Sequence, residues 1–219
     1  MYSHYTCVHG EFIDGVYTIG MGKIILIGGA PAVGKSYLAQ QLSLKLGIPW
    51  ISTSDVNSLM ARPKEEGEAV VEFDSEGQTP QQLLRKLTPQ ENLEQQNREN
   101  EGVWKDVFSF IKLNDLWDSY IIEGVAVLPH LIARDLGKRS DIHPLFLLDK
   151  DEARLRNVVK MKPVWEYSRG YAGRAKKLDL EYVLLFNSWL REQLKKYPFP
   201  SIELSEETMS LAAVLKIIK

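Results

Sequence analysis

The most chemically specific stretch of the chain is residues 29–36, whose sequence is Gly-Ala-Pro-Ala-Val-Gly-Lys-Ser. This spacing, G-x-x-x-x-G-K-S, is typical of a loop whose backbone N–H groups surround phosphates. In such a loop the Lys35 ammonium reaches the β- and γ-phosphates of a nucleoside triphosphate, and the Ser36 hydroxyl holds Mg²⁺. We therefore expect a phosphate site formed by Gly29, Ala30, Pro31, Ala32, Val33, Gly34, Lys35, Ser36 and Tyr37.

Two carboxylates stand where they could act beside this loop. Asp55 closes the stretch Ser52-Thr-Ser-Asp, after an expected strand near residues 48–53. It could accept a hydrogen bond from an acceptor hydroxyl, act as the base for that hydroxyl, hold Mg²⁺ through water, or serve only as a helix N-cap.

Glu123 follows the apolar stretch 120–122, where a phosphate-loop protein needs a carboxylate that orients Mg²⁺ or its water shell. Glutamate is one methylene longer than the commoner aspartate, which favours a base-like or acceptor-binding role over direct metal contact. The alternative is an exposed glutamate at a strand end. Gly124 would allow the backbone to approach a substrate closely.

Cationic side chains that could meet phosphate lie in two places. Arg62 follows Asp55 by two turns of an expected helix and could meet an anionic group on the acceptor. Residues 150–177 carry nine basic and three acidic residues, and Pro163, Gly170 and Gly173 suggest a hinged flap. A run of charges is usually only a solvated face. The candidates for a catalytic clamp are Arg154, Arg156, Arg169 and Arg174, and we expect Arg169 and Arg174 to be catalytic.

Short apolar strands alternate with helices along the chain, which predicts a parallel sheet covered on both faces. The apolar stretch 24–27 leads into the glycine-rich loop, and a helix over 37–46 follows, with Leu38, Leu42 and Leu46 on one face and Gly47 as its stop. Thr88-Pro-Gln-Glu91 has the form of a helix start with a capping box. Further along we expect a helix from 88 to about 110, strands at 119–122, 144–148 and 201–204, and helices at 151–160, 178–196 and from 208.

The domain boundaries follow from composition. Residues 1–20 form an N-terminal extension with a weak hairpin-like alternation, and residues 21–219 form a single domain. Within that domain, residues 60–88 form a polar insert, whose part at 64–76 holds six acidic residues and one basic residue, and residues 150–177 form a small basic lid.

Composition also limits the classes of partner and cofactor that we expect this protein to bind. The net charge of −2 gives no support for a nucleic-acid or membrane partner, and no run approaches 18 apolar residues. Cys7 is the single cysteine, which excludes an internal disulfide and fits a reducing cytosol, so we expect a cytoplasmic protein. The four histidines show no metal-ligand spacing.

These motifs resemble the small-molecule P-loop kinases related to nucleoside and nucleotide monophosphate kinases. Within them, the chain is most similar to the 2-phosphoglycerate-kinase-like group, through residues 29–36, 52–55 with Arg62, and 121–125 with Pro129. The resemblance implies a three-layer α/β/α P-loop fold with a five-stranded parallel core, Mg-ATP as donor, and an acceptor held between Asp55, Glu123 and a mobile helical region. Nucleotide monophosphate kinases usually carry Asp-Gly-x-Pro-Arg at the strand end. The arginine of that motif is missing here, which weakens the case for a nucleotide acceptor.

The favoured hypothesis is an ATP-dependent phosphotransferase acting on a small-molecule hydroxyl or phosphate acceptor, with Asp55, Arg62, Glu123 and Gly124 as the acceptor-binding residues. The alternative is a non-kinase ATPase or nucleotide-dependent switch that uses the acidic insert as a docking surface. Phosphorylation of nucleic-acid ends is a third possibility, which the near-neutral composition does not favour.

Overall fold

The chain forms a five-stranded sheet in the order β4-β5-β3-β6-β7, in which every adjacent pair of strands is parallel. The computed structural model describes residues 12–13, 16–17, 22–60, 88–137, 139–161, 174–204 and 211–218. The expected α/β fold with a five-stranded parallel sheet is confirmed. The strands are β3 (Ile24–Gly29), β4 (Trp50–Ser52), β5 (Tyr120–Glu123), β6 (Ile142–Asp149) and β7 (Ser201–Leu204).

Strands β3 and β5 are buried along their whole length. A parallel strand covered by helices on both faces needs a continuous apolar sequence, and the isoleucine-rich stretches 24–27 and 120–122 supply it. The central position of β3 therefore places its carboxyl end, and the loop that follows, in the middle of the sheet edge.

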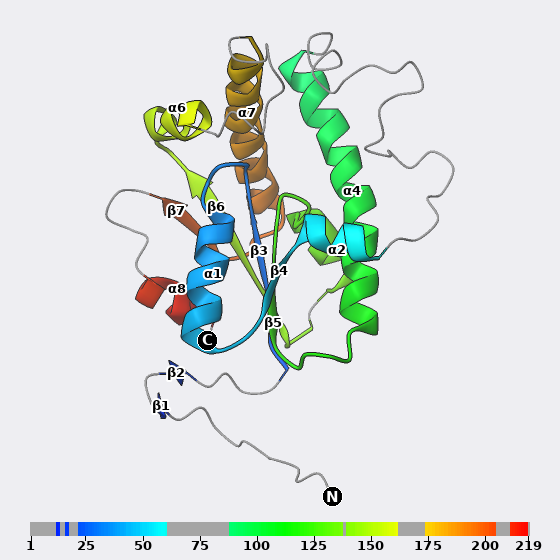
Figure 1. Ribbon diagram of the computed structural model, residues 1–219. Helices are drawn as coiled ribbons and strands as arrows, with labels where there is room; N and C mark the ends of the chain where they lie inside the picture. The colour runs from blue at the N-terminus through cyan, green and yellow to red at the C-terminus, as the bar shows by residue number, and fades with distance from the viewer. Residues whose placement is uncertain are drawn as a thin grey trace, which may run out of the picture.

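Helices cover both faces of this sheet (Figure 1). Helices α1 (Lys35–Leu46) and α8 (Leu211–Ile217) contact each other in one layer. The other layer contains α4 (Pro89–Leu113), α5 (Pro129–Asp135) and α7 (Arg174–Lys196), which contact one another pairwise. The short α2 (Thr53–Leu59) packs against α4, and α6 (Glu152–Met161) packs against α7. Within the described ranges, no helix is both long and apolar enough to cross a membrane.

The helix ends follow local chemistry. Helix α1 buries Leu38, Leu42 and Leu46 and ends at Gly47, whose φ of 67° is left-handed and whose N–H donates to the Ser43 carbonyl over 2.9 Å, as expected. Helix α4 begins with the expected capping box: the Thr88 hydroxyl accepts from Glu91 N–H, and Thr88 N–H donates to the Glu91 carboxylate. It ends at Leu113, three residues later than expected.

One expectation about helices is wrong: α7 begins at Arg174 rather than at 178. The described helices include α2 up to Leu59 and α8 from Leu211. Arg62 and the expected helix start at 208 both lie outside the described residues.

Parts of the expected insert and lid cannot be compared with the structure. Residues 61–87 of the polar insert and residues 162–173 of the basic lid lie outside the described residues. In the N-terminal extension, β1 (Phe12–Ile13) and β2 (Val16–Tyr17) pair antiparallel, as the hairpin-like alternation predicts.

Candidate phosphate-binding site

The glycine-rich loop connects the end of β3 to the start of α1. Gly29 ends the strand with φ 153°, and a Cβ atom there would lie 2.7 Å from the Leu147 carbonyl oxygen of β6, so only glycine fits. The backbone then turns through left-handed residues at Ala32 (φ 66°) and Gly34 (φ 93°). A non-glycine residue with positive φ carries strain that is typical of functional loops. Backbone N–H groups in a loop of this shape can face an anion.

Helix α1 begins directly after this turn, at Lys35. Its N-terminus has no side-chain cap and no acidic residue in the first turn. The first N–H groups of a helix have no acceptor within it, and they carry the positive end of the helix dipole. The start of α1 can therefore bind an anionic group.

The lysine and serine of the loop make two informative contacts. Lys35 is 8% exposed, and its Nζ donates to the Ala30 carbonyl oxygen across the loop over 2.8 Å. The Ser36 hydroxyl donates to Glu123 Oε1 over 2.9 Å, which joins two residues 87 positions apart in the sequence. The structure thus brings together the loop hydroxyl and the strand-end carboxylate that the sequence singled out separately.

Strand register explains why Glu123 reaches this place. Glu123 is the last residue of β5; it pairs with Ile27 of β3 on one side and with Ser52 of β4 on the other. Its side chain is 5% exposed, so Glu123 is not the exposed strand-end glutamate considered above. Because the carboxyl ends of these parallel strands share one edge, the loop, Glu123 and Ser52 meet there.

Asp55 lies near this edge, and its carboxylate is hydrogen-bonded to a neighbour in the sequence. Ser52, and not Asp55, is the N-cap of α2; its Oγ accepts from Asp55 N–H over 3.0 Å. Asp55 Oδ2 accepts in return from Ser52 N–H over 3.4 Å, which completes a capping box, and also from Ser52 Oγ over 2.7 Å. Asp55 is exposed, so its carboxylate remains within reach of a ligand from solvent.

Gly124 packs against a residue that the sequence reasoning missed. A Cβ atom at Gly124 would lie 2.8 Å from both Cβ and Cγ2 of Thr53, a side chain that is 2% exposed. Gly124 therefore allows β5 and the start of α2 to lie close together. The group that its backbone approaches in the structure is the Thr53 side chain. No local pattern in the sequence identifies such a contact between residues 71 positions apart.

The structure describes only part of the expected arginine clamp. Arg62 and Arg169 lie outside the described residues, and Arg174 is the first residue of α7, with its side chain also outside them. Arg156 is exposed and pairs with Glu152 on the same helix over 3.4 Å. Arg154 is different, because its guanidinium binds the carboxylate of Asp149, a side chain with no exposed surface.

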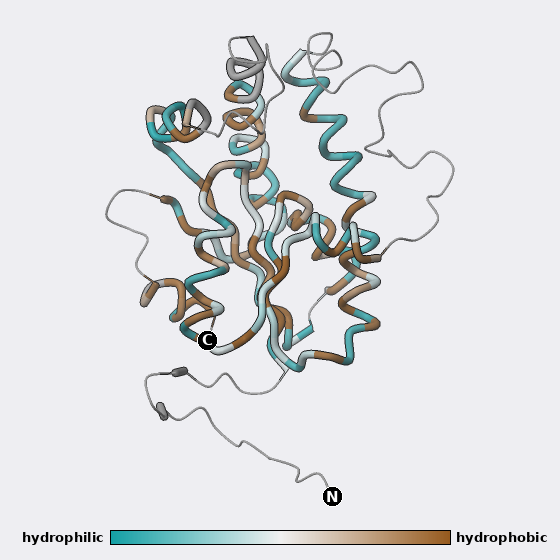
Figure 2. Tube along the Cα trace, in the orientation of Figure 1, coloured by the Kyte–Doolittle hydropathy of each residue, from teal (hydrophilic) through white to brown (hydrophobic). Residues whose placement is uncertain are grey.

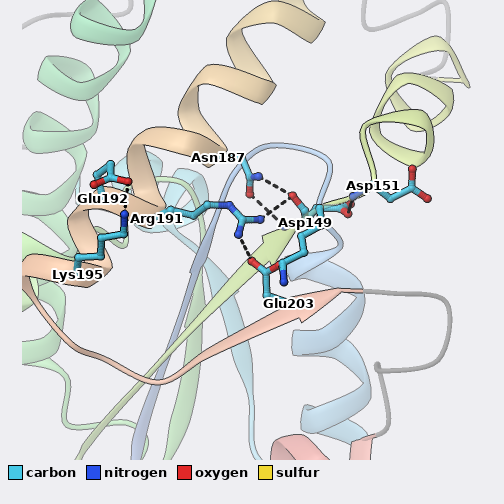
Figure 3. Close-up of polar contacts among 8 residues, drawn as sticks. Asp149, Asp151, Asn187, Arg191, Glu192, Lys195 and Glu203 are labelled. Atoms are coloured by element: carbon cyan, nitrogen blue, oxygen red, sulfur yellow. Dashed lines mark hydrogen bonds and ion pairs between the residues drawn. The ribbon is translucent and has the colours of Figure 1, made fainter.

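Asp149 ends β6 and is held by side chains from α7, one of which also pairs with β7 (Figure 3). Asn187 accepts from Asp149 N–H over 3.1 Å and donates to its carbonyl oxygen over 2.6 Å. Arg191 donates to the same carbonyl over 3.0 Å and forms an ion pair with Glu203 of β7. Lys150 also pairs with Glu203, over 3.0 Å. These contacts fix the end of β6, two residues beyond the point where β6 pairs with the first residue of the glycine-rich loop.

Sequence reasoning did not single out Asp149. The available signal was its position directly after the apolar stretch 144–148, the same signal that identified Glu123. Asn187 and Arg191 gave no signal, because they lie in the middle of an amphipathic helix whose partners are set by tertiary packing.

Comparisons with known proteins give a fold-level likeness. No protein-family model matches the sequence, and no curated protein does. An uncharacterized protein from Eubacterium ventriosum is 16% identical, with 90% of this chain and 97% of that one covered and a TM-score of 0.47. A proposed kinase from Chloroflexus aurantiacus is 15% identical, with 90% and 96% covered and a TM-score of 0.49. A gluconokinase from Sinorhizobium meliloti is 14% identical, with 90% and 89% covered and a TM-score of 0.48.

Proposed function

We propose that this chain is an ATP-dependent phosphotransferase that moves the γ-phosphate of Mg-ATP to a small-molecule acceptor. The observation that carries the proposal is the 2.9 Å hydrogen bond between Ser36 and Glu123, at the end of a glycine-rich loop that opens helix α1. A phosphate loop needs a hydroxyl and a carboxylate side by side to position a divalent cation against phosphate oxygens. The resemblance of the sequence to 2-phosphoglycerate-kinase-like proteins supports the same reaction class.

Lys35 and the start of α1 would bind the phosphates. The Lys35 ammonium now donates to the Ala30 carbonyl inside the loop, and a phosphate oxygen is a stronger acceptor at that place because it is charged. The N–H groups at the start of α1 would add hydrogen bonds to the same anion. The nearly complete burial of Lys35 excludes water, which strengthens its attraction for developing negative charge.

Ser36 and Glu123 would hold Mg²⁺. Mg²⁺ takes oxygen ligands and is usually bound through one or two protein groups together with phosphates and water. The Ser36 hydroxyl directs its proton toward Glu123, which leaves lone pairs of Oγ available to a cation. Mg²⁺, when bound, would neutralise charge on the phosphates, while Glu123 orients the serine hydroxyl or a metal-bound water.

The acceptor would lie beside Asp55 and Gly124. Among the described contacts of Asp55, the carboxylate is bonded through Oδ2, so Oδ1 can accept a hydrogen bond from an acceptor hydroxyl. Arg62, Arg169 and Arg174 remain proposals for cations that meet the acceptor or the transferred phosphoryl group. Catalysis would consist mainly of positioning and electrostatic stabilisation, as in other phosphoryl transfers.

The test is ADP release from Mg-ATP, measured with a coupled assay against phosphoglycerates, sugars, nucleosides and nucleotides. We expect one acceptor class to stimulate ADP release, and Lys35→Ala to lower the stimulated rate by about 10²–10³-fold. Lys45→Ala is the matched control, because it makes the same change in the last turn of the same helix. A flat panel combined with tight nucleotide binding would overturn the proposal in favour of a regulatory ATPase or switch.

A further inference from the structure

The inward face of α4 is apolar in its C-terminal half but includes polar side chains in its N-terminal half. Residues spaced alternately by four and three positions form one stripe along the helix, which is Leu93, Asn97, Asn100, Trp104, Val107 and Ile111. Trp104, Val107 and Ile111 are buried with the apolar core. Two asparagines occupy the stripe in the N-terminal half, where Figure 2 shows a mainly hydrophilic helix.

These two asparagines carry buried polar atoms that have no hydrogen-bond partner among the described residues. Asn100 is 5% exposed, and the atom concerned is its Nδ2. In Asn97 it is Oδ1, which is likewise buried. Burying an amide group without a hydrogen bond costs free energy, and such groups are rare in folded proteins. The pair is therefore more consistent with recognition of a ligand than with packing alone.

Neighbouring amides on the same helix show the contrast. Gln95 Nε2 donates to Glu99 over 3.1 Å, and Gln96 Nε2 donates to the other oxygen of Glu99 over 2.7 Å. Helix α4 can thus satisfy amide side chains locally through residues three or four positions away. Asn97 and Asn100 do not use this route, and on a helix residues three apart are neighbours.

The position of α4 links the asparagines to the candidate site. Helix α4 packs against α2, which carries Asp55, and against α7, which carries Asn187 and holds the end of β6. In Figure 1, the N-terminal part of α4 and that of α7 extend beyond the sheet on the side of the phosphate loop. The half of α4 that carries both asparagines therefore lies on the same side of the sheet as the phosphate loop.

We propose that Asn97 and Asn100 bind uncharged hydroxyl groups of the phosphoryl acceptor, so that the acceptor is a polyhydroxylated compound such as a sugar, a polyol or a sugar acid. This inference rests on the proposed phosphotransferase function. An unpartnered N–H donor and an unpartnered oxygen acceptor, one turn apart, complement hydroxyls, which both donate and accept. A fully ionised phosphate ester or a carboxylate offers only acceptors and would leave Asn97 Oδ1 unsatisfied.

The experiment compares wild type with Asn100→Leu, which keeps the branched shape of the side chain and replaces its amide, including the buried donor, with two methyl groups. Binding is measured by calorimetry in the presence of Mg-ADP, with D-glucose, xylitol, D-gluconate and D-glycerate as hydroxyl-bearing probes. Sulfate and succinate serve as hydroxyl-free anions. Gln90→Leu is the matched control, since Gln90 is an exposed amide in the first turn of the same helix.

We expect at least one hydroxyl-bearing probe to bind wild type and to bind Asn100→Leu at least tenfold more weakly, with Mg-ADP affinity unchanged. The thermal midpoint of Asn100→Leu should stay level or rise, because no partner within the protein is lost. A structural role would instead lower that midpoint and leave probe affinity unchanged. Equal affinity in both proteins, or binding of the hydroxyl-free anions alone, would overturn the inference.

The two proposals can fail separately. If a hydroxylated probe binds through Asn100 but never stimulates ADP release, the hydroxyl site stands and the phosphotransferase proposal fails. If ADP release depends on an acceptor whose KM is the same in Asn100→Leu and wild type, the phosphotransferase stands and the hydroxyl site fails.

Discussion

Replacing Gly124 by alanine tests whether the close approach of β5 and α2 positions the acceptor side of the site. The new Cβ would lie 2.8 Å from Cβ and Cγ2 of Thr53, closer than side-chain carbons approach one another. Thr53 is 2% exposed and begins α2 directly after the Ser52 N-cap, so it cannot move without moving the capping box. Overpacking of this kind costs about 1–3 kcal/mol.

For a chain of 219 residues, this cost corresponds to a fall in Tm of roughly 2–4 °C per kcal/mol. Because the displaced segment carries Asp55, we also expect KM for the acceptor to rise more than KM for ATP. Urea denaturation measures the first effect, and the ADP-release assay measures the second. Gly102→Ala is the control: it lies inside α4 with nothing within 4 Å of an added Cβ, and it should stabilise the protein by about 0.5–1 kcal/mol.

A second variant tests whether steric contact with Thr53 causes the loss of stability in Gly124→Ala. Thr53→Ala removes Cγ2 and Oγ1, so the double variant should recover part of the stability that Gly124→Ala loses, as a non-zero coupling in a double-mutant cycle. If Gly124→Ala is as stable as wild type, or if the two changes are strictly additive, steric contact between these residues does not position α2.

Two further predictions concern charge. Arg154→Ala leaves the buried Asp149 carboxylate without its cation and should lower the free energy of unfolding by about 1–3 kcal/mol, whereas Arg156→Ala removes an exposed pair and should change it by less than about 0.5 kcal/mol in urea denaturation. Burial, with a smaller effect of Lys23, lowers the pKa of His143 below its ordinary 6.5. The unfolded chain then binds the extra proton more readily, so stability is present above pH 6.5 and is lost as pH falls below it. His143→Gln should flatten that decline in urea midpoints measured from pH 8 to pH 5; an unchanged slope would refute this.

Local rules account for the parts of the site that the sequence predicted. The apolar stretch 24–27, the glycines at 29 and 34 and the stop at Gly47 act within a few residues of one another, so the strand, loop and helix could be located without knowledge of the rest. Glu123 could be placed at a strand end for the same reason. Its pairing with Ser36 depends on β3 and β5 being neighbours with a specific register, which alternation of strands and helices does not determine.

Contacts between distant segments account for the parts that were missed. Thr53 meets Gly124, and Asn187 meets Asp149, across 71 and 38 positions of sequence that no local pattern connects. Asn97 and Asn100 were visible as polar residues in an apolar stripe, but only burial without a partner distinguishes them from a solvated helix face.

The length of the Glu123 side chain now has a physical explanation. Strand β5 ends opposite Ile27, two residues before Gly29 closes β3, so its last side chain must extend along the sheet edge to meet the start of α1. An aspartate would be shorter by one carbon–carbon bond, about 1.5 Å. From the same backbone, its carboxylate would lie beyond hydrogen-bond distance of Ser36 Oγ, which Glu123 meets at 2.9 Å. The extra methylene therefore does not by itself argue for a base that acts on the acceptor. It is what this register requires for a carboxylate to reach the loop hydroxyl, which favours a role for Glu123 on the phosphate side of the site.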